Sequence, residues 1–138
     1  MNILKIFTKS REIGNTGEAL AAKHLKKHGY KIVARNYCDY KYEIDIIAEN
    51  KTTLAFVEVK TRTTSSLSAD CKRPASAVNP EKQRKIIEAV NHYRSYNSTK
   101  KRISLDVVEV YLDDNKKPEK ILHIENAFNS NTAYTKRR

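Results

Sequence analysis

IDIIAENKTTLAFVEVKTR, residues 44–62, is the stretch that decides the fold of this chain. It holds two runs of apolar and β-branched residues on either side of the polar segment NKTT, which is the pattern of two antiparallel strands joined by a hairpin turn. Three charged residues interrupt the runs: Asp45, Glu58 and Lys60. Charged side chains are rarely buried unless they are paired or bind a metal ion, so these residues are the first candidates for a functional site.

The alternation of side chains along a strand predicts how these charges are placed. Ile44 and Ile46 should share one face of the first strand and Asp45 the other, while Glu58 and Lys60 share a face of the second strand. The hairpin can then bring Asp45 near Glu58, and two carboxylates that close repel unless a cation lies between them. Carboxylate oxygens suit Mg²⁺ or Mn²⁺. Lys60 would then orient or help to deprotonate an attacking water, or neutralise charge on a phosphate.

A fourth acidic residue, Glu18, heads the apolar stripe of a helix predicted over about 14–28. Its simpler role would be a favourable interaction with the helix dipole, or a capping box. Asp45 has a structural alternative as a hydrogen-bonded carboxylate at a strand end, and Glu58 with Lys60 as an exposed cross-strand ion pair. The conjunction of the four residues favours a shared site.

Hydrophobic periodicity and turn signals beyond the hairpin predict one mixed α/β domain, with helices packed on a central sheet in the order α-β-β-β-α-β-β. The expected elements are a helix over 14–28, strands over 30–36, 42–49 and 53–60, a helix over 80–96, and strands over 102–112 and 120–128. We expect residues 1–138 to form a single domain with a core over about 13–126. A polar loop over 61–79 is long enough to be functional or mobile, and a basic tail over 127–138 should be frayed.

The charge balance indicates a polyanionic partner, because the chain has 27 Lys and Arg against 16 Asp and Glu, a net charge of +11. DNA is the first expectation. The apolar run over residues 3–7 is too short for a signal peptide or a membrane span, so we expect no membrane partner and a cytoplasmic location. Cys38 and Cys71 show no metal-ligand pairing and are expected to be reduced.

Basic residues concentrate between Lys72 and Arg102, where nine of them stand against two acids. For any single lysine a solvated helix face is the simpler interpretation, whereas the cluster as a whole favours contacts with nucleic-acid phosphates. The candidates for these contacts are Lys72, Arg73, Lys82, Arg84 and Lys85.

Three further patterns are expected to be structural. His24 and His28 have the spacing of half a zinc site, but no third ligand is offered nearby, so we interpret them as solvated. Tyr93 lies at helical spacing from Val90 and should be core rather than a stacking platform. Asp106, in a predicted strand, is expected to serve in structural hydrogen bonds.

Four sequence blocks carry a family resemblance: GNTGEALAAKHLKKHGYKIVARN (14–36), EIDIIA (43–48), FVEVKTR (56–62) and LDVVEV (105–110). In this order and spacing they resemble the YraN-like family of small bacterial proteins regarded as endonucleases. The Asp and Glu-x-Lys pattern also resembles the signature of the PD-(D/E)XK nuclease superfamily, whose fold is that of restriction endonucleases and archaeal Holliday-junction resolvases. The resemblance covers about residues 14–110.

The resemblance implies a metal-dependent deoxyribonuclease that hydrolyses phosphodiester bonds with Mg²⁺ or Mn²⁺, with its selectivity for DNA structure left open. Carried over by position, it implies that Asp45, Glu58 and the Val59 carbonyl bind the metal. It further implies that Lys60 assists the water, that Glu18 supports the site and that Gln83 lies at its edge. Cleavage of a DNA junction would need paired sites, which a homodimer would supply.

One position departs from the family pattern, because Tyr42 stands where glycine usually precedes Glu-Ile-Asp. Glycine allows a close approach of a nucleic-acid backbone that a phenol ring obstructs. We expect the Tyr42 ring on the apolar side of the sheet; the alternative interpretation is that it stacks on a nucleic-acid base. A nucleic-acid-binding module that keeps the fold without catalysis is therefore the main alternative, and an RNA-binding or protein-interaction role is a third.

Overall fold

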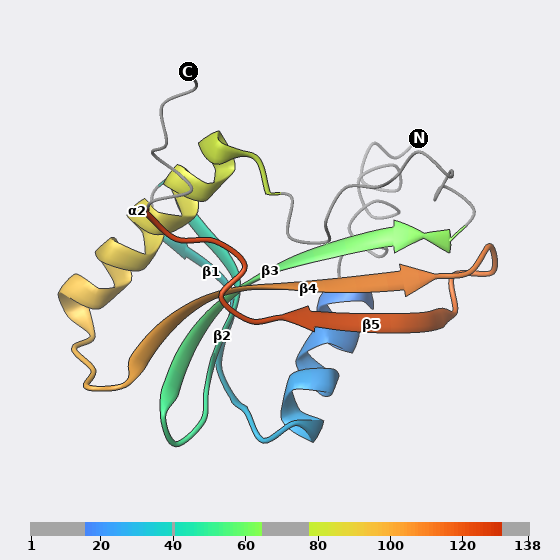
Figure 1. The fold of residues 1–138 in the computed structure, drawn as a ribbon, viewed down its shortest axis with the longest axis horizontal. Coiled ribbons are helices and arrows are strands. Elements are labelled where there is room, and N and C mark those ends of the chain that lie inside the picture. The colour runs from blue at the N-terminus through green and yellow to red at the C-terminus, as the bar shows by residue number, and fades with distance from the viewer. Residues whose placement is uncertain (1–15, 40, 65–77, 131–138) are drawn as a thin grey trace, which may run out of the picture.

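The computed structural model describes residues 16–39, 41–64 and 78–130. Within them the chain forms a five-stranded mixed sheet and two helices, in the predicted order α-β-β-β-α-β-β. The elements are an N-terminal helix over 16–27, β1 (Lys31–Asp39), β2 (Tyr42–Glu49), β3 (Thr53–Thr63), α2 (Pro80–Tyr96), β4 (Arg102–Leu112) and β5 (Pro118–Ile124) (Figure 1).

The sheet has the strand order β1-β2-β3-β4-β5. Neighbouring strands pair antiparallel except β3 and β4, which are parallel. Antiparallel neighbours can be joined by a tight turn, whereas parallel neighbours need a crossover. Here the crossover contains α2, which accounts for the mixed sheet that the sequence predicts.

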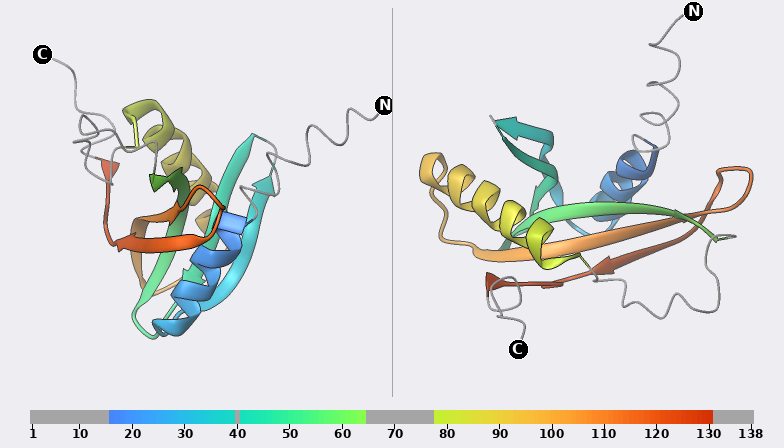
Figure 2. Two further views of the ribbon diagram at one scale, coloured as in Figure 1. Left: turned by 90° about the vertical axis from the view of Figure 1, so that its right-hand side faces the viewer. Right: turned by 90° about the horizontal axis from the view of Figure 1, so that it is seen from above.

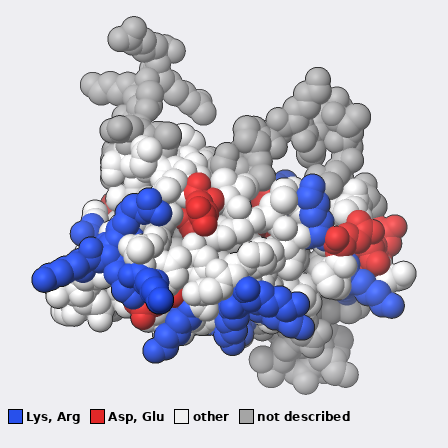
Figure 3. All heavy atoms as spheres, turned by 60° about the horizontal axis from the view of Figure 1, so that its bottom comes forward, with Lys and Arg blue, Asp and Glu red and all other residues white. Residues whose placement is uncertain are grey.

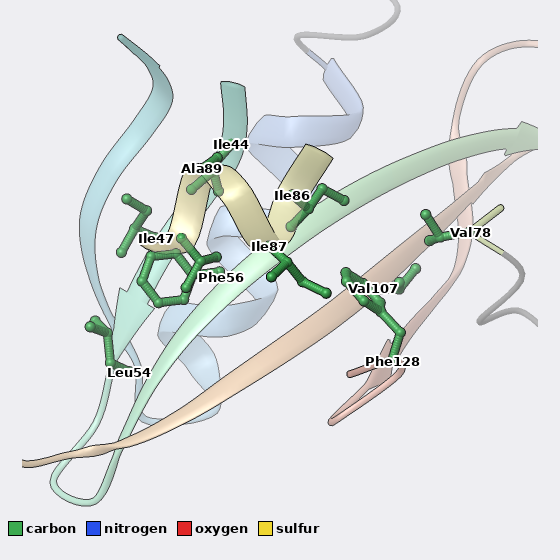
Figure 4. Close-up of a cluster of buried hydrophobic side chains, with 11 residues drawn as sticks. Ile44, Ile47, Leu54, Phe56, Val78, Ile86, Ile87, Ala89, Val107 and Phe128 are labelled. Carbon is green, nitrogen blue, oxygen red and sulfur yellow. The ribbon is translucent and has the colours of Figure 1, made fainter. Parts of the chain in front are cut away.

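Alternate side chains of β3 supply two hydrophobic cores. Phe56 packs on one face with Ile47 of β2 and Ile86 of α2 (Figure 4). Val57 packs on the other face with Leu25 of the N-terminal helix. The two helices therefore cover opposite faces of the sheet (Figure 2).

Both ends of α2 are capped by asparagine. Asn79 is the N-cap, and its side chain accepts a hydrogen bond from the Lys82 N–H at 2.8 Å, with Pro80 at the first helical position. At the other end, the backbone N–H of Asn97 donates to the Tyr93 carbonyl at 3.0 Å. Both predicted bounds of this helix, 80 and 96, are confirmed.

The N-terminal helix ends at residue 27, one residue before the predicted end, and Gly29 follows it with a φ of 89°. That left-handed conformation is costly for other residues. The Tyr30 N–H donates to the Leu25 carbonyl at 3.0 Å, and both side chains are buried in the same core. This is a Schellman motif with its accompanying hydrophobic contact.

The NKTT segment forms the expected hairpin turn between β2 and β3. The Asn50 N–H donates to the Thr53 carbonyl at 3.0 Å, and the Asn50 side chain accepts from the Thr53 N–H at 2.8 Å. The asparagine side chain thus imitates a backbone turn, which explains why this polar segment closes the hairpin without glycine.

β1 is longer than the predicted strand over 30–36, because pairing with β2 extends it to Asp39. β5 covers 118–124 instead of the predicted 120–128. It stops there because the chain turns at Asn126, with a φ of 49°, and the Asn126 N–H donates to Asp106 at 3.1 Å. The structural hydrogen bonding expected of Asp106 is confirmed. Phe128, which the expected boundary assigned to the tail, is buried in the core beside α2.

Candidate functional site

The candidate site lies where the sheet divides between β2 and β3. These strands pair only from Ile46–Val57 to Glu49–Leu54. Beyond that point β2 stays paired with β1, and β3 continues beside β4 to Thr63. Figure 2 shows the first two strands turning away from the other three. Asp45 and Glu58 are the next residues past the last ladder pair, so both stand at this fork.

The structure brings the two carboxyl groups together, as predicted. Asp45 Oδ2 accepts a hydrogen bond from the Val59 N–H at 2.8 Å, and the Asp45 and Glu58 carboxyl groups lie close enough for each to affect the pKa of the other. The Val59 N–H is a strand donor that loses its ladder partner at the fork, so Asp45 takes the place of the missing strand. The Glu58 side chain is 15% exposed. A carboxyl pair in this position is shielded from water on most sides.

The pKa of Glu58 is raised to about 7, chiefly by burial and then by the neighbouring Asp45 charge, while Lys82 and Lys60 act in the opposite direction. Burial also raises the pKa of Asp45, although the Val59 N–H stabilises its ionised form. Like charges so close cannot both ionise at low cost. The pair therefore favours either a shared proton or a bound cation near neutral pH.

Two lysines act on this pair. Lys82, from the first turn of α2, has its Nζ 3.8 Å from Glu58 Oε1. Lys60 follows Glu58 by two positions in β3, and its charge lowers the Glu58 pKa. Cations thus approach the carboxyl pair from the strand and from the helix.

Glu18 reaches the same fork from the N-terminal helix. It is half-buried, and the Asp45 charge adds to burial in raising its pKa. An Asn36 side-chain hydrogen bond opposes that rise, while no described group hydrogen-bonds to the buried Oε2 atom. A cavity of about 230 Å³ lies between these elements and is lined by Glu18, Asn36, Tyr37, Cys38, Glu43, Ile44 and Asp45. An unpartnered carboxylate oxygen beside a cavity is a place for a water or an ion.

The helix comes this close because of Gly17. A Cβ at that position would lie 1.9 Å from Thr61 Oγ1 of β3, far inside van der Waals contact. Glycine is therefore the residue that lets the start of the helix rest on the strand that carries Glu58 and Lys60.

Not all predicted residues gather here. Gln83 is buried and donates from its side-chain amide to the Val78 carbonyl at 2.6 Å, so its described contact is within the fold. Lys85 is exposed and lies 3.8 Å from Glu81 across one helical turn. Arg84 is on the same helix and is half-buried. The remaining two candidates, Lys72 and Arg73, lie outside the described residues.

The alternation predicted for β2 is wrong at one position. Ile44 does not share a face with Ile46: it packs with Ile47 in the core beside α2, whereas Ile46 packs beside the N-terminal helix. β2 separates from β3 at Asp45, and regular alternation does not continue through the separation. Tyr42 packs against the α2 core and stacks on His92 with ring centroids 4.7 Å apart, so its expected apolar orientation is confirmed.

Two polar residues of the site region were missed. Asn36 has a φ of 51° in the middle of β1, a conformation that asparagine tolerates better than most residues. Glu109 is buried in β4 at the register position opposite Lys60. The sequence signal for Glu109 was an acid within the apolar run LDVVEV. Its position opposite Lys60 depends on a parallel register that a single sequence does not show.

The carboxyl pair of Asp45 and Glu58 supplies two oxygen donors of the kind that a hard divalent cation prefers. Within 16–39, 41–64 and 78–130, no three His, Cys, Asp or Glu side chains are arranged to hold a metal ion. Asp45 and Glu58 are two carboxylates with a repulsion that a cation would relieve, and magnesium often takes only one or two protein carboxylates. The residues present therefore fit a cation held by this pair with backbone and solvent oxygens.

By its fold and its site, the protein is a mixed α/β domain that carries a carboxyl pair where its sheet forks. The sequence model described as uncharacterised protein family UPF0102 matches residues 17–110. A UPF0102 protein of Desulfosudis oleivorans is 44% identical over 124 residues, 89% of this chain and 94% of the relative. One from Caldanaerobacter subterraneus is 42% identical over 120 residues, 86% and 95% of the two chains.

The chain belongs to the UPF0102 family. This confirms the YraN-like resemblance at the level of the family, and the matched range 17–110 contains Glu18, Asp45 and Glu58. None of the described helices is long and apolar enough to span a membrane.

Proposed function

We propose that this protein is an endonuclease of the PD-(D/E)XK kind that hydrolyses phosphodiester bonds in DNA with Mg²⁺ or Mn²⁺. The observation that carries the proposal is the half-buried pair of Asp45 and Glu58, whose carboxyl groups affect each other's pKa at the fork. A protein that needed only a stable sheet would gain nothing from two acids that oppose each other's ionisation. With Lys60 alongside, the group has the components of phosphodiester hydrolysis.

In this proposal Asp45, Glu58 and the Val59 carbonyl would hold the cation. A bound divalent ion supplies polarisation of a phosphoryl oxygen and a lower pKa for a nearby water. Asp45 is fixed for this role by the Val59 N–H, because that hydrogen bond restricts its carboxylate to one orientation. Glu58 is available only when deprotonated, which its pKa of about 7 allows at neutral to alkaline pH.

The other residues have roles that follow from their positions. Lys60, on the same strand as Glu58, would orient the attacking water or stabilise charge that develops on the phosphate. Glu18, with its unpartnered Oε2 beside the cavity, would hold a second water or accept its proton. Lys82 would move from Glu58 toward a substrate phosphate, since its side chain is 43% exposed.

The DNA partner is supported by charge. Figure 3 shows Lys and Arg in several groups around one face of the molecule, and the chain carries a net charge of +11. Lys82, Arg84 and Lys85 follow one another at the N-terminal end of α2, next to the carboxyl pair. A DNA strand held there would have its phosphates close to the fork.

The test begins with the metal, which requires no knowledge of the DNA structure that is cut. Mn²⁺ titrated into isotope-labelled protein should broaden backbone amide signals around Asp45, Glu58 and Lys60. Asp45→Asn should remove this broadening, because the amide keeps an acceptor for the Val59 N–H and loses the charge. The matched control is Glu88→Gln, an exposed acid on α2.

The second stage is cleavage of a panel of duplex, flap, single-stranded and four-way-junction DNA with Mg²⁺ or Mn²⁺. Glu58→Gln should reduce cleavage at least 100-fold, while DNA affinity stays within a few fold of wild type. Diffuse broadening in the first stage, or none into the millimolar range, would contradict the metal site and the proposed reaction with it.

A second candidate function has one observation in its favour. Lys82 already places a positive charge 3.8 Å from Glu58, where a metal ion would otherwise balance the pair. In a nucleic-acid-binding module without catalysis, the two acids and this lysine would balance one another's charges and leave no place for a metal ion. Wild-type DNA affinity that is unaffected by Mn²⁺, in a protein without localised broadening, would favour this module.

A further inference from the structure

A second charged pair lies further along β3 and β4, beyond the carboxyl pair. Glu109 is 1% exposed, and its Oε2 accepts a hydrogen bond from the Tyr111 hydroxyl. Its Oε1 has no hydrogen-bond partner among the described residues, but lies 3.6 Å from Arg62 Nε. A carboxylate buried to this degree is costly unless a positive charge compensates it, and Arg62 is the cation that the structure provides.

The register of the parallel strands places this pair beside the proposed catalytic lysine. Lys60 is the partner of Glu109, and Arg62 is the partner of Tyr111. Glu58, Lys60 and Arg62 are alternate residues of β3, so they project from the same face in a row with steps of about 6.5 Å. The carboxyl pair, the lysine and the arginine therefore follow one another along one strand.

Arg62 forms an ion pair with Glu109, although its buried Nε has no hydrogen-bond partner among the described residues. Its Nε faces the buried Glu109, while its side chain as a whole remains 32% exposed. A guanidinium carries five N–H donors in a planar fork, so the Nε contact leaves the terminal donors for another acceptor. An arginine oriented by a buried carboxylate is preorganised for an acceptor with two oxygens, such as a phosphate.

We infer that Lys60 and Arg62 form a phosphate-binding site whose ligand is a phosphodiester of the bound nucleic acid, with Glu109 as the positioning residue of Arg62. This rests on the proposed function, and it adds a site on the far side of Lys60 from the carboxyl pair. A strand bound along β3 would place one phosphate at the fork and a neighbouring phosphate at Arg62. The arginine would thereby set the direction in which the strand runs across the site.

The experiment measures binding without metal, so that cleavage does not enter. A fluorescently labelled 12-nucleotide oligothymidine and a 12-base-pair duplex are titrated with protein at low salt. The first variant, Arg62→Lys, keeps the positive charge and loses the planar guanidinium with its paired donors. The second, Glu109→Gln, keeps the shape of the side chain and loses the negative charge that faces Arg62. Arg94→Lys, an exposed arginine in the last turn of α2, is the matched control.

Arg62→Lys should weaken binding of at least one of these DNAs by 5-fold or more, with Arg94→Lys within 2-fold of wild type. In spectra of arginine Nε–H groups, the Arg62 signal should shift on addition of the oligonucleotide. Glu109→Gln should broaden that signal in the free protein and weaken the same DNA at least 3-fold. A Glu109 that only supported folding would lower stability without changing this signal.

Each other outcome counts against the inference. DNA affinity of Arg62→Lys within 2-fold of wild type would overturn it, while localised Mn²⁺ broadening at Asp45 would leave the proposed function standing. A shift of the Arg62 signal with inorganic phosphate but not with either DNA would make free phosphate the ligand. Wild-type protein that binds neither DNA would overturn this site and the DNA partner together, again independently of the Mn²⁺ result. Because Arg62 is partly exposed, Arg62→Lys should fold even if Glu109→Gln does not.

Discussion

At the scale of single residues, the site depends on how two carboxyl groups share a small volume. Their proximity could be predicted because Asp45 and Glu58 follow from strand alternation and a short hairpin, both of which are local properties of the sequence. The hydrogen bond from the Val59 N–H could not be predicted, because it exists only where β2 leaves β3. A single sequence does not show where two strands separate.

The raised pKa of Glu58 predicts an unusual dependence of stability on pH. Its pKa increases from 4.5 in the unfolded chain to about 7 in the folded protein, so the native state binds the proton more tightly. This contribution to stability is present below pH 4.5 and is lost as the pH rises through about 7. Denaturant unfolding without metal should therefore show stability falling from pH 5 to pH 8.

The matched variant for this prediction is Glu58→Gln, which cannot ionise and should lose most of that fall. Mn²⁺ affinity of the wild type should change in the opposite direction and increase over the same interval, because the ion competes with the proton. A wild-type stability that is flat or rising between pH 5 and pH 8 would contradict the assignment of a shared proton to the pair.

At the scale of elements, the strand and helix bounds were predictable where the pattern is local. α2 has a capping asparagine, a proline and helical spacing, and β4 has a continuous apolar run, so both follow directly from the sequence. β1 was predicted too short because Tyr37, Cys38 and Asp39 carry no strand pattern of their own, and their pairing with β2 is not visible in a single sequence. The close packing of the N-terminal helix on β3 was not predicted, because the contact between Gly17 and Thr61 joins residues far apart in the chain.

The contact between this helix and β3 can be tested by Gly17→Ala. Alanine favours helix, but its Cβ would overlap Thr61 Oγ1, and such overpacking typically costs about 1–3 kcal/mol. We expect a lower free energy of unfolding and, because Glu18 is displaced from the fork, weaker Mn²⁺ broadening near that residue. Chemical denaturation and the Mn²⁺ titration measure the two effects.

Thr61→Ala in the same chain provides the control for this contact. It removes the Oγ1 atom and leaves only the Thr61 Cβ, which lies 3.1 Å from the added carbon. The double variant should regain most of the stability lost by Gly17→Ala. If the two changes were simply additive, the helix would not be positioned by this contact.

At the scale of the whole molecule, the net charge of +11 indicates a polyanionic partner but does not show where on the surface that partner would bind. The sequence placed a basic cluster along residues 72–102, of which the structure describes 78–102, and Figure 3 shows Lys and Arg in several groups across the viewed face. The order of elements and the mixed sheet were predictable from helix and strand periodicity. The parallel register that aligns Lys60 with Glu109 was not, because it joins residues far apart in the chain.

The salt dependence of binding tests which basic group contacts DNA. Changing Arg84 and Lys85 together to glutamine should lower the slope of log affinity against log salt by about one to two. The matched control changes Lys116 and Lys117, which are exposed in the turn between β4 and β5. An unchanged slope in the α2 variant, with a reduced slope in the control, would move the binding surface to that turn.

The parallel pairing of β3 with β4 also has a consequence for how the protein is made. Asp45 and Glu58 are 13 residues apart, whereas Lys60 and its partner Glu109 are 49 apart. Closing the longer loop costs roughly 1 kcal/mol more entropy, and contacts of long sequence separation form late. A growing chain would thus expose its acidic hairpin before α2 has left the ribosome, at a stage when Lys82 of α2 is not yet there to balance the charges of Asp45 and Glu58.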